Sequence, residues 1–239
     1  MIGADFEKIQ FVLFGWELVE PMALITDTIM GTISIIFGLK VAKLKSSHPF
    51  YLYWSLFFII FGIGSFWGGF AHAFYGYWGI PGKIPSWISG PTSVYCLEQA
   101  MISANKKEKW IKRFKGISFW KLVVVLVSFI LVLTFADLKE KPELGFLPIA
   151  INTIVGVSFF AGVLGLIYVK RGYVSLYKYF SLGVLIMLPS SFVFLMKINL
   201  HQWFDKNDLS HVLLTLGITY FFIGVRKLHK QGFLQDAYI

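Results

Sequence analysis

Seven stretches of about 20 apolar residues divide this chain of 239 residues, and they constrain its fold more than any other feature. The hydrocarbon core of a bilayer is about 30 Å thick, and an α-helix needs about 20 residues to cross it. A helix also bonds its own backbone polar groups, as hydrocarbon requires. We therefore expect an all-α polytopic membrane protein, a bundle of seven transmembrane helices. The expected spans are residues 21–39, 51–74, 86–104, 117–136, 144–169, 179–198 and 208–225.

The composition agrees with a membrane protein and excludes a soluble domain. Hydrophobic residues make up 56% of the chain and charged residues 15%, with a mean hydropathy of +0.68. The third span carries Glu98 and Gln99, so we expect it to face other helices and not lipid. The single Cys96 excludes an intramolecular disulfide and a pair of thiol ligands.

No repeat or soluble segment is visible, so residues 1–239 are expected to form one domain. The first 20 residues are acidic and interrupted, unlike a signal peptide, and we expect them to lie at the outer membrane interface. Residues 226–239 are expected to form a short cytoplasmic tail.

The basic residues predict the orientation, because lysines and arginines in short loops are retained in the cytoplasm. Sixteen of the 22 follow the first, third, fifth or seventh span: Lys40, Lys43, Lys45, Lys106, Lys107, Lys109, Lys112, Arg113, Lys115, Lys121, Lys170, Arg171, Lys178, Arg226, Lys227 and Lys230. The N-terminus is therefore expected outside and the C-terminus inside. The net charge of +9 then reflects topology and contact with anionic lipid headgroups, and it is not evidence for nucleic acid binding.

Ionisable residues of the first two spans fall at similar depths. Glu20 precedes the first span, and Asp27 lies seven residues later, about 10 Å deeper on the same face. In the second span His72 lies near the outer end, and Ser65 lies seven residues deeper on the same face. A carboxylate seven residues inside a span needs a partner, because an isolated charge is costly there.

The seventh span begins with Asn207, Asp208 and His211 in "NDLSHVLLTLG". Three spans thus offer ionisable groups to one outer layer, which predicts a shared site. Two simpler interpretations stay open. Asp208 or Asn207 would be a natural helix cap, and a single histidine near the interface is often only a packing residue.

Together these motifs resemble those of a known family. "EPMALITD", "GGFAHAF" and "NDLSHVLLTLG", with the seven-span layout, resemble the alkaline ceramidase and progestin/adiponectin-receptor superfamily of membrane hydrolases, and most closely its uncharacterised bacterial branch. The resemblance implies a zinc enzyme that cleaves an amide or ester bond of a ceramide-like lipid in the outer leaflet. It also implies a bacterial inner (plasma) membrane protein.

By this resemblance, His72 and His211 take two zinc-ligand positions, and the third falls at Asn207. Asn207 is a poor zinc ligand, so Asp208 is expected to replace it, or Asp27 to complete the set. Gly68 occupies the position where the family has a serine, which leaves Ser65 one turn deeper.

Three ligands of this kind leave zinc a fourth position for water, whose pKa falls to about 7. The resemblance makes Asp27, Glu20 and Ser65 the candidate catalytic residues. Asp27 or Glu20 would act as a general base or hold a histidine tautomer.

Other functions remain open. A receptor or lipid-binding protein on the same scaffold would explain Asn207. An ion or proton pathway needs ionisable groups throughout the bilayer, and only Glu98 lies toward the inner half. A retinal protein is excluded, because "HVLLTLGITYFFIGV" contains no lysine for a Schiff base.

Overall fold

The computed structural model describes residues 2–44 and 46–232, and within them the fold is helical except for one short hairpin. The helices, in chain order, are α1 (Pro21–Ala42), α2 (Pro49–Ala73), α3 (Tyr75–Ser103), α4 (Glu108–Phe135), α5 (Leu147–Gly156), α6 (Leu164–Lys170), α7 (Lys178–Leu195) and α8 (Lys206–Lys230). A π-helical stretch, η2 (Val157–Val163), joins α5 to α6 in one continuous rod, and 3₁₀ turns lie at η1 (Pro142–Gly145) and η3 (Ser175–Tyr177).

Each of the seven expected spans overlaps one of these helices, if α5, η2 and α6 are taken together as one. Six are long and apolar enough to cross a membrane, and they indicate a multi-pass membrane protein. The remaining helix, α3, is not among the six. It carries Lys83 and Glu98 and three internal prolines, and it is kinked at Gly79. It also begins at Tyr75, eleven residues before the start expected from the sequence.

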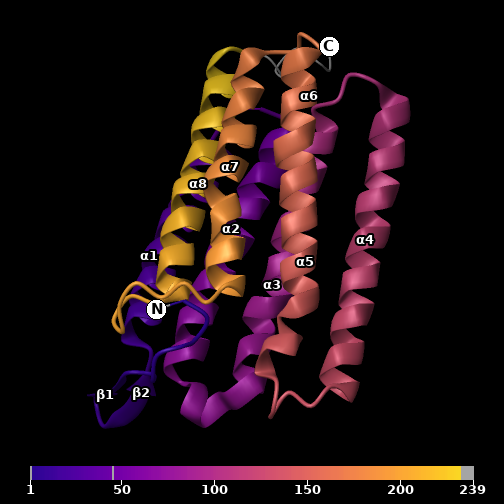
Figure 1. Ribbon diagram of the computed structural model, residues 1–239. Coiled ribbons are helices and arrows are strands. Elements are labelled where there is room, and N and C mark those ends of the chain that lie inside the picture. The colour runs from indigo at the N-terminus through magenta and orange to yellow at the C-terminus, as the bar shows by residue number, and fades with distance from the viewer. Residues whose placement is uncertain (1, 45, 233–239) are drawn as a thin grey trace.

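The N-terminal segment forms a structure that the sequence did not predict. Strands β1 (Gln10–Leu13) and β2 (Trp16–Val19) pair antiparallel around Phe14 and Gly15, which both have positive φ angles, 51° and 83°. This is the backbone that tight two-residue hairpins need. The hairpin lies at the end of the bundle where α1 and α8 begin (Figure 1).

The opposite end of the chain also differs from expectation. Helix α8 continues to Lys230, so residues 226–230 belong to the helix and not to a tail. The last residues of the expected tail, 233–239, lie outside the described part of the chain.

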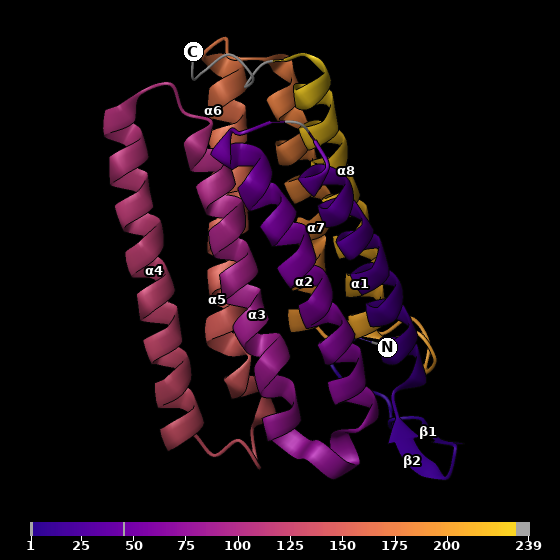
Figure 2. The same ribbon diagram turned by 180° about the vertical axis from the view of Figure 1, so that it is seen from behind.

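The bundle places α1 between α2 and α8, with α3 beside α2 and α7 beside α8. Helix α4 lies at the edge, against α3 and α5 (Figure 2). Glycines bring two helix pairs close. A Cβ atom on Gly31 of α1 would lie 2.8 Å from the carbonyl oxygen of Gly62 of α2, and the pair Gly183 and Gly217 plays the same part between α7 and α8. Small residues allow this approach where no hydrophobic effect drives helices together.

Candidate functional site

The first part of the site lies where the hairpin meets α1. Glu20 immediately precedes α1, and the backbone turns there with a positive φ of 54°. One oxygen of its carboxylate accepts a hydrogen bond from Nδ1 of His72 at 2.7 Å, and the other lies 3.0 Å from Nζ of Lys8. Burial raises the pKa of Glu20, but its hydrogen bonds with His72 and Lys8 and its attraction to the charge of Lys8 outweigh this effect, so its pKa lies below the ordinary 4.5. An ionised Glu20 thus binds the Nδ1–H of His72 and leaves Nε2 available.

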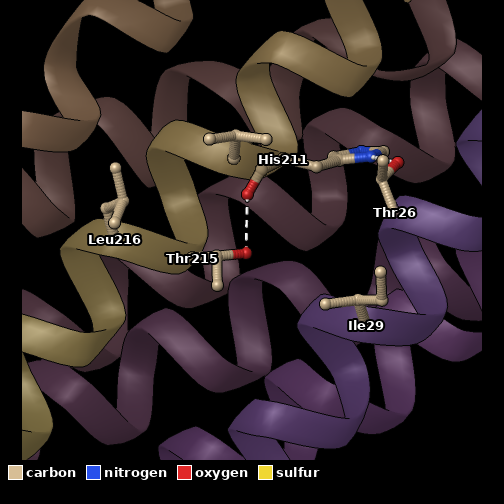
Figure 3. Close-up of a pocket in the computed structure, with 6 residues that line it drawn as sticks. Thr26, Ile29, His211, Thr215 and Leu216 are labelled. Carbon is tan, nitrogen blue, oxygen red and sulfur yellow. Dashed lines mark hydrogen bonds between the residues drawn. The ribbon is translucent and has the colours of Figure 1, made fainter.

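His211 of α8 is oriented by Thr26 of α1 (Figure 3). The Thr26 hydroxyl lies 2.8 Å from Nδ1 of His211, 3.1 Å from Oδ1 of Asp208 and 2.9 Å from the carbonyl oxygen of Met22. Its single proton has three oxygen acceptors within reach: Asp208, Met22 and, at 3.4 Å, the carbonyl of Ala23. Because the Thr26 proton goes to an oxygen, the Thr26 hydroxyl acts as acceptor toward His211. This favours the tautomer in which Nδ1 of His211 carries the hydrogen and donates a hydrogen bond to Thr26, while Nε2 keeps a lone pair.

Asp27 faces that lone pair. Its side chain is only 6% exposed, and Oδ1 lies 3.5 Å from Nε2 of His211. Two acceptors that face each other need a proton or a cation between them. Bond lengths of 2.0–2.1 Å place two ligands of a tetrahedral zinc about 3.4 Å apart, so this pair has the spacing of two ligands of one ion.

Helix α3 adds two polar groups that the sequence analysis missed. A Cβ atom at Gly68 would lie 3.3 Å from Oδ2 of Asp27 and 3.2 Å from Oγ of Ser86. Ser86 thus brings a hydroxyl to the place where the resemblance expects a serine at position 68. Lys83, one turn earlier on α3, interacts electrostatically with Asp27 and Glu20. Lys83 and Ser86 are three residues apart in "PGKIPSW", which places them on one face of a helix. The sequence analysis missed this pair because it expected the helix to begin only at residue 86.

The start of α8 corrects two predicted roles. The N-cap is Asp205, and not Asp208 or Asn207. The Asp205 side chain accepts hydrogen bonds from the backbone amides of Asn207 and Asp208, and Oδ2 of Asp208 accepts from the backbone amide of Asp205 at 3.0 Å. This reciprocal capping box satisfies two amides at the helix start. The apolar run begins later than the helix, which is why the sequence placed the cap too late.

Two further candidates are occupied by local contacts. The side-chain amide of Asn207 donates to Asp205 at 3.2 Å, and the hydroxyl of Ser65 donates to the carbonyl of Phe61 in the same helix at 3.0 Å. Both polar groups serve their own helices.

The ionisable groups thus converge as two pairs, and not as one cluster. Glu20 holds His72, and Asp27 faces His211. Over residues 2–44 and 46–232, no three or more His, Cys, Asp or Glu side chains stand close enough together to hold a metal ion. The donor chemistry and one ligand spacing fit zinc, but the third ligand is not in place.

Fold and site together define a multi-pass helical membrane protein with histidines and carboxylates gathered at one end of its bundle. The chain belongs to a family of unknown function, DUF6962, which it matches over residues 22–230. The match includes Asp27, His72 and His211, and it begins two residues after Glu20. No curated protein and no solved structure matches the chain significantly.

Proposed function

We propose that this protein is a zinc-dependent membrane hydrolase that cleaves an amide or ester bond of a ceramide-like lipid in the outer leaflet. The observation that carries the proposal is the orientation of the two imidazoles. Glu20 engages Nδ1 of His72 and Thr26 engages Nδ1 of His211, so each ring keeps Nε2 for an ion. Histidines that bind zinc are held in this way by carboxylates or other acceptors.

The ligands in this proposal are His72, His211 and Asp27. Asp27 replaces Asp208 as the oxygen ligand because both oxygens of Asp208 already accept hydrogen bonds, from Thr26 and from the Asp205 amide. Zinc held by such a set would supply a water of lowered pKa and would polarise a carbonyl.

The remaining residues have distinct parts in the proposal. Glu20 and Asp208 orient the histidines, Asp208 through the Thr26 hydroxyl. Ser86, whose hydroxyl lies near Gly68 as Oδ2 of Asp27 does, would hydrogen-bond a reacting group, and Lys83, which interacts electrostatically with Asp27, would stabilise the oxygen that becomes negative during acyl transfer.

The proposal includes seven spans, with the N-terminus outside and the C-terminus inside, in a bacterial inner membrane. Helix α3 would cross the membrane in addition to the six apolar helices, with its polar residues shielded by its neighbours α2 and α4. The basic ends of the helices would then meet anionic lipid headgroups on the cytoplasmic side.

A second candidate function is a receptor or lipid-binding protein. The observation that favours it is that the described residues form no three-ligand group. The polar groups would then bind a lipid headgroup without cleaving it.

Zinc content and lipid hydrolysis test the proposal together. We expect one zinc per purified chain, measured by mass spectrometry of the metal, and loss of both zinc and hydrolysis in His72→Ala, His211→Ala and Asp27→Asn. The matched control is His201→Ala, since His201 is exposed in the loop before α8 and should leave zinc unchanged. A wild-type protein without bound metal, and without hydrolysis of amide or ester lipids after zinc is added, would support the receptor instead.

A further inference from the structure

A cavity of about 150 Å³ lies between α1 and α8, directly beside His211 (Figure 3). Its lining comes from two turns of each helix: Thr26, Ile29, His211, Val212, Thr215 and Leu216. Both helices are among the six candidate membrane spans. The cavity therefore lies between two helices that are each long and apolar enough to cross a membrane.

The cavity opens toward the lipid. Ile29 on one wall is 52% exposed and Leu216 on the other is 49% exposed, so both side chains stand at the surface of the bundle. Leu216 lies five residues beyond His211, about 7.5 Å further along α8. Helices α1 and α8 begin at the same end of the bundle (Figure 1). Because Leu216 follows His211 along α8, the groove that both residues line runs from His211 away from that end.

The lining is apolar in spite of its two threonines. The hydroxyl of Thr215 donates to the carbonyl of His211 at 2.7 Å, and that of Thr26 is held by His211, Asp208 and Met22. Neither hydroxyl therefore has a proton left to donate to a guest. Among the lining residues, the imidazole of His211 thus provides the polar end of an otherwise apolar groove, which suits a chain with a reactive group at its head.

We infer that this groove between α1 and α8 is a lateral opening through which an acyl lipid reaches the site from within the bilayer, with the start of its acyl chain against Ile29 and Leu216. The inference rests on the proposed function, because it places the scissile carbonyl at His211 and Asp27. A chain already in hydrocarbon gains little by moving into an apolar groove. The groove therefore orients the substrate and does not hold it tightly.

The test is photolabelling in phosphatidylcholine vesicles with an N-acyl lipid that carries a diazirine near the carbonyl end of its acyl chain. We expect labelled peptides to contain Ile29 or Leu216. Leu216→Trp, which fills the groove, should abolish labelling of Ile29, and Ile29→Trp should do the same from the opposite wall. Leu185→Trp is the matched control, since Leu185 of α7 is 65% exposed and does not line the groove.

Hydrolysis separates this inference from the proposed function. Leu216→Trp should slow cleavage of the bilayer lipid but leave cleavage of a water-soluble acetyl ester unchanged, because the short ester does not need the groove. Equal labelling of Ile29 in the Leu216→Trp and Leu185→Trp proteins, or no labelling of either wall in the wild type, would overturn the groove. If Ile29 and Leu216 are labelled and Leu216→Trp abolishes the labelling of Ile29, but the protein hydrolyses no lipid, the groove binds an acyl chain and the proposed hydrolase function is wrong.

Discussion

The hydroxyl of Thr26 in α1 lies 2.8 Å from Nδ1 of His211 in α8. A residue 185 positions away in the sequence therefore orients this imidazole. The same hydroxyl is 3.1 Å from Asp208. Asp208 and His211 both belong to α8, but the carboxylate influences the imidazole through Thr26 of α1. Contacts of this kind align a metal ligand without touching the metal.

Thr26→Val tests this contact, because valine keeps the shape of threonine and removes the hydroxyl. We expect zinc affinity and hydrolysis to fall by about 10- to 100-fold, as is usual when a partner of a metal-binding histidine is lost. Zinc titration with a competing chelator measures the affinity. Thr215→Val is the control, since the Thr215 hydroxyl bonds only the carbonyl of His211 among the described contacts. An equal loss in both variants would show that any change in the groove disturbs the site.

The two carboxylates near His211 should differ in their effect on metal. Asp27→Asn is expected to remove zinc, because Oδ1 of Asp27 is the oxygen that faces Nε2. Asp208→Asn should retain most of the zinc and lower stability instead, by about 1 kcal/mol, because it weakens the capping box. Metal content and thermal unfolding of the purified variants give the two readouts. Zinc lost from Asp208→Asn and kept in Asp27→Asn would reverse the assignment.

Glu20 should make the stability of the folded protein depend on pH in the acidic range. Its pKa is lowered in the folded protein, so its contribution is complete above its ordinary pKa of 4.5 and is lost as the pH falls toward the folded pKa. Wild type should therefore exceed Glu20→Gln in unfolding temperature at pH 7, and the difference should shrink below about pH 4.5. Thermal unfolding in detergent from pH 3 to pH 7 measures it. Glu17→Gln, on an exposed strand of the same hairpin, is the control. A difference that stays constant over this range would contradict the ion pair.

A second buried ion pair, distant in sequence from the histidines, should be important for stability. Glu98 is fully buried, with Oε1 2.8 Å from Nζ of Lys121 and Oε2 accepting a hydrogen bond from Ser118. Lys121→Met leaves this charge without its partner and should cost about 3–5 kcal/mol. Adding Glu98→Gln should recover most of that loss.

Thermal unfolding of both variants in detergent measures this effect. Lys112→Met is the control, because Lys112 pairs with Glu108 on the exposed surface and contributes little. If Lys121→Met alone and Lys121→Met with Glu98→Gln destabilise the protein equally, the unpaired charge of Glu98 is not the cause of the loss.

The segment at residues 105–116, which comprises the short loop after α3 and the first turns of α4, is expected to face the cytoplasm, because it contains six basic residues and Lys121 follows it. A cysteine placed there should not react with a membrane-impermeant reagent in intact cells, whereas one at residues 137–143 should react. The native Cys96 is buried and should give little background. Strong labelling of the 105–116 segment in intact cells would reverse the orientation and place the histidines on the inner side.

The sequence alone was sufficient for the helices and for the depth of the main site residues. Hydrophobic length predicted the six helices that are long and apolar enough to cross a membrane, because crossing hydrocarbon requires about 20 apolar residues wherever the helix packs. A rise of about 1.5 Å per residue then brought Asp27, His72 and His211 to one end of the bundle. In the structure Oδ1 of Asp27 lies 3.5 Å from Nε2 of His211, and His72 contacts Glu20, the residue immediately before α1.

Only the tertiary structure decided which of these groups touch. Thr26 and Ser86 have no polar signal that distinguishes them from other hydroxyl residues, and they join the site because α1 and α3 present those faces to it. Asp208 satisfies its oxygens at Thr26 and at the helix cap, while Asp27 is left facing Nε2 of His211. Hydrophobic length is a property of one segment, whereas the rotation of a helix about its axis is set by all the neighbours that pack against it.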